Sequence, residues 1–139
     1  MSGGDEDLAG FYERYLRTCN EHRFDDLGAF VADDVEVDDE PVGLAVYVDG
    51  LRALVEGFPD YRWHLRHLLV DGDLVSAHFE DTGRHLGQLR HLGPRWRLPA
   101  TGRPVRVQEF AVYRVRDGQI RQVWARGDDL AVVEQLTRD

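Results

Sequence analysis

The sequence predicts an α+β fold in which a curved antiparallel sheet curls around helices from the first part of the chain. Before residue 60 most apolar residues recur at helical spacing, whereas beyond it they alternate with polar residues, as in strands with one buried face. A chain in which the helices come first and the strands follow is typical of α+β domains. The 139 residues suffice for one domain, residues 1–139, and no Pro-, Ser- or Gly-rich linker divides them.

Three helices are expected in the first part. The first is amphipathic and covers residues 5–21, with Tyr15 in the middle of its apolar stripe. That stripe consists of Leu8, Phe11, Tyr12, Tyr15, Leu16 and Cys19. A short helix over residues 24–31 follows, and a third over residues 48–56 ends at Gly57.

A short strand is expected between the second and third helices. Val35, Val37 and Asp39 alternate there with acidic residues, ahead of a turn at Pro41. If both valines face the core, Asp39 does as well. Because Asp39 also belongs to an acidic run over residues 33–40, a solvated turn is the alternative.

Two further strands are predicted over residues 61–70 and 74–82, joined by a turn at residues 71–73. Alternation along the first of them places Trp63 and His67 on the same face. That face consists of Trp63, Leu65, His67 and Leu69. We therefore expect His67 to point inward, with a purely structural histidine as the alternative.

The last third of the chain predicts a β-hairpin. A strand over residues 105–115 and a strand through Trp124 flank Asp117-Gly118, a dipeptide that tolerates positive φ at both turn positions. Glu109 is the one acidic residue on the apolar face of the first strand. It lines the interior if that face is buried, and it meets solvent or a partner if the faces are reversed.

Composition narrows the function classes. The net charge of −9 argues against nucleic acid or an anionic membrane as a partner, and no apolar segment has the length of a membrane span. We therefore expect a cytoplasmic protein. The lone Cys19 allows no internal disulfide, no Cys/His spacing suggests zinc, and no Gly-rich phosphate loop precedes a helix. All 17 basic residues are Arg, which excludes Schiff-base chemistry on lysine.

Several motifs in order resemble the SnoaL-like polyketide cyclases. They are Pro99-Ala100-Thr101-Gly102-Arg103-Pro104-Val105, the turn from Arg114 to Ile120, Trp124 four residues before Asp128, Gln135-Leu136, Phe58-Pro59-Asp60 and Gly83-Arg84-His85-Leu86-Gly87. Arg84 stands where the family more often has Thr. The resemblance implies a cone-shaped α+β barrel of the kind shared with nuclear transport factor two and ketosteroid isomerase. In these cyclases the acid/base is the Asp of the Trp-x-x-x-Asp element, here Asp128.

Residues 31–43 are in addition similar to the segment of ketosteroid isomerases that ends in the catalytic base. That register places Asp39 on the base and Tyr15 on the oxyanion tyrosine. The third isomerase group falls at Ala111, which cannot donate a hydrogen bond. The resemblance therefore supports the isomerase reaction only in part.

The cyclase resemblance implies an intramolecular aldol closure on a bulky apolar, polyketide-like substrate. A carboxylate removes a proton flanked by carbonyls and a carbonyl oxygen gains one, so no metal or cofactor is expected. Burial raises the pKa of such a carboxyl toward the working pH. The expected catalytic residues are Asp128, Asp39 and Tyr15. The expected substrate-binding residues are His67, Glu109, Trp63, His85 and Trp124.

Other interpretations stay open. Epoxide hydrolysis or epoxide-opening cyclisation needs paired carboxylates, which Asp39 with Glu109 or Asp128 can form, and a non-catalytic binding or dimerisation domain needs none of them. Tyr15 and His85 also fit structural roles, and Asp128 fits a helix cap. A homodimer is expected through the strand face of residues 108–114. The segment Arg95-Trp96-Arg97 is expected on an exposed loop, with a lid over the pocket mouth as the alternative.

Overall fold

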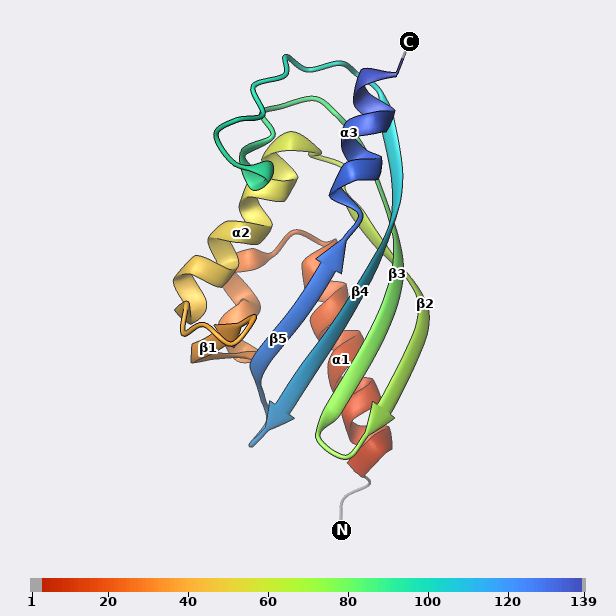
Figure 1. The fold of residues 1–139 in the computed structure, drawn as a ribbon. Helices are drawn as coiled ribbons and strands as arrows, with labels where there is room; N and C mark the ends of the chain where they lie inside the picture. Colours follow the sequence, from red (N-terminus) through yellow and green to blue (C-terminus); the bar gives the residue numbers. More distant parts are fainter. Residues whose placement is uncertain (1–3, 139) are drawn as a thin grey trace.

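The structure, a computed structural model, describes residues 4–138, with side chains from residue 7 onward. Its elements confirm the predicted order of helices followed by a sheet (Figure 1). They are α1 (Gly4–Asn20), η1 (Phe24–Ala29), β1 (Val31–Val37), α2 (Gly43–Gly57), β2 (Arg62–Asp71), β3 (Leu74–Arg84), η2 (Arg90–Leu92), β4 (Pro104–Arg116), β5 (Gln119–Gly127) and α3 (Asp129–Thr137).

The five strands form one curved, open sheet in the order β1-β5-β4-β3-β2. Its neighbours are antiparallel except β1 and β5, which are parallel, so the expectation of a wholly antiparallel sheet holds for four strands. Helix α1 packs against β2 and β3 on the concave side, α2 packs against β1 and η2, and α3 lies against β4 (Figure 1). No helix among residues 4–138 is long and apolar enough to cross a membrane.

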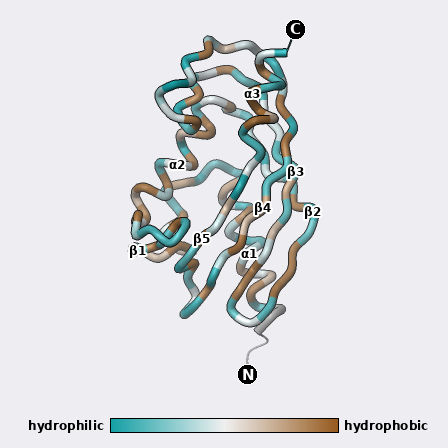
Figure 2. Tube along the Cα trace, viewed as in Figure 1, coloured by the Kyte–Doolittle hydropathy of each residue, from teal (hydrophilic) through white to brown (hydrophobic). Residues whose placement is uncertain are grey.

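The core lies between α1 and the concave face of the sheet. Apolar and polar positions alternate along β3 and β4, which appears in Figure 2 as alternating brown and teal. Tyr12, Leu27 and Val35 are fully buried in this core. Burial of one strand face against a helix is what makes the two-residue period visible in the sequence.

Turn chemistry explains where β1 ends and the hairpin closes. Asp38 and Asp39 have φ values of 51° and 69°, so the chain leaves the extended conformation there and β1 stops at Val37. Helix α2 begins at Gly43, five residues before the predicted start. The Asp117-Gly118 turn is confirmed, with φ of 54° and 74° at its two positions.

A β-bulge in β2 changes which side chains face the core. Leu65 pairs with Phe79, but His67 pairs with the next residue, His78, so one extra residue interrupts the ladder. Beyond the bulge Leu68 and Val70 take the inward positions, since a one-residue slip moves every following side chain to the other face.

The segment between β3 and β4, residues 85–103, crosses the open end of the cone and is called the strap. The guanidinium of Arg90 in the strap donates to Asp49 and Glu56 of α2, and Leu89 is buried beneath it. At Gly87 the strap approaches α2 so closely that a Cβ there would lie 1.9 Å from the carbonyl oxygen of Glu56. Glycine is therefore required at this crossing.

Candidate active site

A cavity of about 130 Å³ lies at the open end of the cone, under the strap. We call it the inner cavity. Its walls come from α2, three strands, the strap and the start of α3, and they consist of Leu54, Phe58, Tyr61, Asp81, His91, Val105, Val107, Glu109, Gly127, Asp128, Asp129 and Val132. This volume is smaller than the range of about 300–1,000 Å³ that is typical of ligand pockets. Four of its lining residues are acidic.

Asp81 and Glu109 form the buried part of this acidic group. The Tyr61 hydroxyl donates to Asp81 Oδ2 over 2.7 Å, and Asp81 is 1% exposed. Asp81 Oδ1 receives no hydrogen bond from a fixed donor, although the Glu109 carboxyl lies within hydrogen-bonding reach of Asp81. Because an unpaired buried acceptor costs free energy, a proton on Glu109 completes the arrangement.

The pKa of Glu109 is raised above its usual range, chiefly by burial and then by the hydrogen bond and charge of Asp81. The Trp63 side chain hydrogen-bonds to Glu109 and opposes this rise. Burial also raises the pKa of Asp81. The pair therefore keeps a proton near neutral pH, as expected where two carboxyls share a desolvated site. Glu109 is thus available as a neutral acid.

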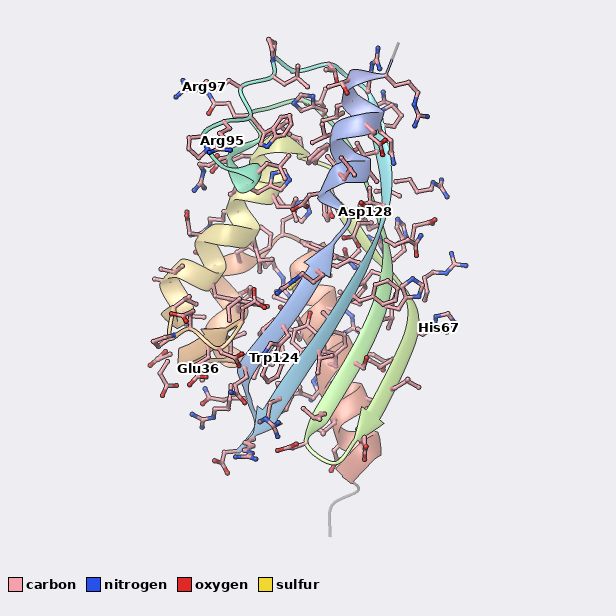
Figure 3. All side chains as sticks on the ribbon, in the orientation of Figure 1. Glu36, His67, Arg95, Arg97, Trp124 and Asp128 are labelled. Atoms are coloured by element: carbon pink, nitrogen blue, oxygen red, sulfur yellow. The ribbon has the colours of Figure 1, made fainter. Side chains whose placement is uncertain are left out.

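Asp128 and Asp129 form the rim of the inner cavity, where β5 turns into α3 (Figure 3). Asp128 is the N-cap of α3, and its Oδ1 accepts a hydrogen bond from the Ala131 backbone N–H over 3.0 Å. Its second oxygen lies on an exposed side chain at the cavity edge. Asp128 thus caps the helix and lines the cavity at once.

His91 of the strap completes the polar lining. Its Nδ1 is buried without a hydrogen-bond partner among the described residues. Burial, and after it the nearby His85, lowers the pKa of His91 to about 4. The imidazole is therefore neutral at physiological pH and can either accept or donate a proton.

His85 is fully buried and anchors the strap. Its Nδ1 accepts a hydrogen bond from the Thr101 backbone N–H over 3.1 Å, so the ring proton is on Nε2. The ring packs against Phe58, and His85 does not line the inner cavity. These contacts support a structural role for His85.

The other end of the cone is filled by tyrosines. The Tyr12 hydroxyl donates to the Tyr113 hydroxyl over 3.1 Å, and the hydroxyls of Tyr15 and Tyr47 form a second hydrogen bond. Burial raises the pKa of Tyr15 well above its usual value, so its hydroxyl is neutral. Tyr15 lies in this closed end and does not line the inner cavity.

Comparisons with known proteins identify the family and the fold. The model of the SnoaL-like polyketide cyclase family matches residues 7–136. The chain belongs to this family. A SnoaL-like polyketide cyclase from Agrobacterium tumefaciens is 32% identical, with a TM-score of 0.78 over 93% of this chain and 97% of the other.

More distant solved structures share the fold with this SnoaL-like protein. IdmH of Streptomyces antibioticus, a candidate polyketide cyclase, is 21% identical with a TM-score of 0.79 over 92% of this chain and 96% of its own. AclR of Streptomyces galilaeus, a candidate hydroxylase, is 16% identical with a TM-score of 0.81 over 96% and 98%. No curated protein matches the chain.

Other predicted site residues of this SnoaL-like protein, among them Asp39 and Trp124, lie outside the inner cavity. Asp39 is exposed on the turn after β1, where its Oδ1 accepts a hydrogen bond from the Trp124 indole over 3.1 Å. Trp124 pairs with Val112 and so faces the outer side of the sheet (Figure 3). The prediction that Asp39 points inward is therefore wrong, because the chain turns at positive φ before reaching it. Asp39 is exposed whereas Tyr15 is buried in the closed end of the cone, so the described residues do not form the isomerase-like arrangement.

His67 is also outside the site, because the bulge in β2 turns it outward (Figure 3). Its ring stacks on His78, and the two Nδ1 atoms are 2.9 Å apart. These rings belong to an apolar patch on the outer side of the sheet, called the outer patch. It consists of His67, Leu69, His78, Phe110, Val112 and Trp124. Phe110 is 60% exposed within it.

The inner cavity also contains residues that are not among the predicted site residues. Asp81 follows Val75, Ala77 and Phe79 on the buried face of β3, the same signal that singled out Glu109. Its partner Tyr61 precedes β2, and His91 lies in the strap, where no periodicity marks it. Among residues 7–138 no group of three or more His, Cys, Asp or Glu side chains has the arrangement of a metal site.

Proposed function

We propose that the inner cavity performs acid/base chemistry of the polyketide cyclase type on a substrate whose reactive end enters it. The observation that supports this proposal is that one cavity is lined by a proton-retaining carboxyl, Glu109, and by the rim carboxylate of Asp128. A neutral carboxyl that can donate a proton and a second carboxyl that can accept one are suited to act as an acid and a base together.

In the proposed reaction Asp128 removes a proton from a carbon between two carbonyls. The resulting enolate attacks a second carbonyl carbon of the same chain and forms the new C–C bond. The acceptor oxygen takes a proton from Glu109, and the proton held by Asp128 restores that group. The product is an isomer of the substrate, so no electron donor or acceptor is consumed. Positioning in a confined cavity supplies the alignment that aldol closure needs.

The family and the cavity support different parts of this proposal. The family match supports a polyketide cyclase-type role, and Asp128 stands in the Trp-x-x-x-Asp position that the resemblance implies for the acid/base. The volume of about 130 Å³ supports entry of a reactive end rather than of a whole polycyclic molecule. The remaining part of the substrate then lies outside, against the strap.

The test replaces Asp128 with Asn, which keeps the size of the side chain and remains a good helix cap. The assay follows ring closure of an aryl β-keto ester that carries a second ketone, by absorbance and by the unchanged mass of the product. We expect turnover to fall about a hundredfold or more, with unfolding changed by less than ~0.5 kcal/mol. Turnover near the wild-type value in Asp128→Asn would refute the proposal.

The carboxyl pair also favours a second candidate function, epoxide opening. One carboxylate of Asp81 and Glu109 activates water or a hydroxyl, the protonated one donates to the epoxide oxygen, and Tyr61 orients the pair. A cyclic aliphatic epoxide in ¹⁸O-labelled water separates the two functions. Epoxide opening requires Asp81→Asn to lose activity and Asp128→Asn to retain it, whereas the cyclase reaction requires Asp128.

A further inference from the structure

The charge of this acidic protein is unevenly distributed, and the strap is its basic region. Between residues 82 and 108 the chain has six arginines and none of its 26 acidic residues. The other 11 arginines share the remaining sequence with all 26 acids. The strap lies within this segment, so it contributes arginines and no carboxylate beside the open end of the cone.

Of these six arginines, only Arg90 and Arg106 form salt bridges among the residues whose side chains are described. Arg90 is paired with Asp49 and Glu56. Arg95 and Arg97 are exposed and form no salt bridge with a carboxylate in the part of the chain whose side chains are described. The Arg97 guanidinium makes a single hydrogen bond, from Nε to the Pro94 carbonyl over 3.3 Å. Most of its donors remain available to a ligand.

A second cavity, of about 500 Å³, opens at Arg97, two residues after Arg95 in the chain, and we call it the outer cavity. It is lined by Gln88, Leu89, Arg90, Gly93, Pro94, Trp96, Arg97, Leu98 and Pro99. Its volume falls in the range of small-molecule sites, and its lining combines an aromatic ring and aliphatic side chains with a free guanidinium. That combination suits an apolar ligand that carries one anionic group.

The two cavities adjoin the same short stretch of chain. Leu89 and Arg90 line the outer cavity, and the next residue, His91, lines the inner one. Their electrostatics are opposite, because the inner cavity has four acidic residues and the outer cavity has none. An anionic group is repelled from the first and attracted to the second. Figure 3 shows Arg95 and Arg97 on the outward side of the strap, away from Asp128.

We propose that the outer cavity binds the anionic end of an amphipathic substrate, a carboxylate or a phosphate, while the neutral reactive end reaches the inner cavity. Arg97 and Arg95 provide the charge, and Trp96 provides the apolar surface. Binding of the anionic end does not depend on the proposed reaction. Only the placement of the neutral end in the inner cavity rests on the proposed function. Two sources of the anion fit the same chemistry, namely a carboxylic acid on the substrate itself and the phosphate of a pantetheine arm that carries it.

The test measures binding by calorimetry with two matched pairs of probes. The first pair is naphthalene-2-carboxylate and naphthalene-2-carboxamide, and the second is 4′-phosphopantetheine and pantetheine. We expect the wild-type protein to bind at least one anionic probe at least fivefold more tightly than its neutral partner. In Arg95→Gln/Arg97→Gln the Kd of that probe rises about five- to tenfold, since each exposed charge contact contributes up to about fivefold. Added salt weakens this binding in the same way.

The control variant Arg66→Gln/Arg126→Gln removes the same charge from the exposed outer side of the sheet. It should leave the Kd within twofold and so exclude an effect of net charge alone. A preference for the carboxylate pair assigns the anion to the substrate itself, and a preference for the phosphate pair assigns it to a carrier arm. Equal binding of anionic and neutral probes, or an unchanged Kd in the strap variant, overturns the proposal.

This binding result and the proposed reaction fail separately. Asp128→Asn should lose turnover and keep the Kd of the anionic probe. If that variant keeps its turnover while the strap arginines still determine binding, the reaction is wrong and the anion site stands. If turnover depends on Asp128 but the neutral probes bind as tightly as the anions, the reaction stands and the substrate class is wrong.

Discussion

Replacing Glu109 with Gln should raise the stability of the protein at neutral pH, and by more as the pH increases. The pKa of Glu109 is raised in the folded protein by burial and by Asp81, whereas in the unfolded chain it returns to about 4.3. Above this value the unfolded chain releases the proton and the folded protein keeps it. Stability is therefore fully present at low pH and is lost as the pH rises, by at most about 1.4 kcal/mol per pH unit for one proton.

The Gln side chain mimics the protonated acid, because its amide still donates to Asp81 while it has no proton to lose. From about pH 5 to about pH 7 the unfolding free energy of Glu109→Gln should gain about 2–3 kcal/mol relative to the wild type. Urea unfolding followed by circular dichroism measures this difference. Glu134→Gln, at an exposed position of α3, is the matched control and should show no such trend. A difference that does not change with pH would mean that Glu109 is ionised in the folded protein and would refute the reasoning.

Three further predictions concern the closed end, the strap and the outer patch. Tyr113→Phe leaves the buried Tyr12 hydroxyl without its partner and should cost about 1–2 kcal/mol of unfolding free energy, most of which the double Phe variant with Tyr12→Phe recovers. Gly87→Ala should destabilise by more than about 2 kcal/mol, because its Cβ meets an α2 carbonyl. Gly50→Ala, with open space and a helical position, should stabilise by up to about 1 kcal/mol in the same thermal melts. We also propose that a second copy covers the outer patch, so sedimentation at micromolar concentration should show a dimer that Phe110→Asp dissociates, and a wild-type monomer would contradict this.

The comparison of β3 with β4 shows how far alternation identifies site residues. Glu109 was selected from the sequence because it interrupts an apolar strand face, and the structure places it on the buried side of β4. Asp81 interrupts the face of β3 in the same way, and the same argument applied to that strand identifies it. What alternation does not provide is their pairing, because that depends on the register between the two strands.

The positions of other candidate residues are decided by backbone features that leave no periodic signal in the sequence. His67 would point inward if β2 were unbroken, but the bulge in β2 turns it outward. Asp39 continues the alternation of β1 in the sequence, but positive φ at Asp38 and at Asp39 itself ends the strand at Val37. His91 belongs to the strap, whose path is determined by Arg90 and by the close approach at Gly87.

The sequence by itself determined the order of helices and strands, the hairpin turn, and the family, because these depend on local patterning and on motifs that are contiguous in the chain. It also determined the excess of arginine and the absence of acids in residues 82–108, although not where that segment lies. Tertiary structure decided that Asp81 meets Glu109, that Asp128 joins them at the rim, and that the strap separates an acidic cavity from a basic one. These groups come from segments far apart in the chain. Their proximity, and the raised pKa values of Asp81 and Glu109, arise only when folding brings them together and removes water.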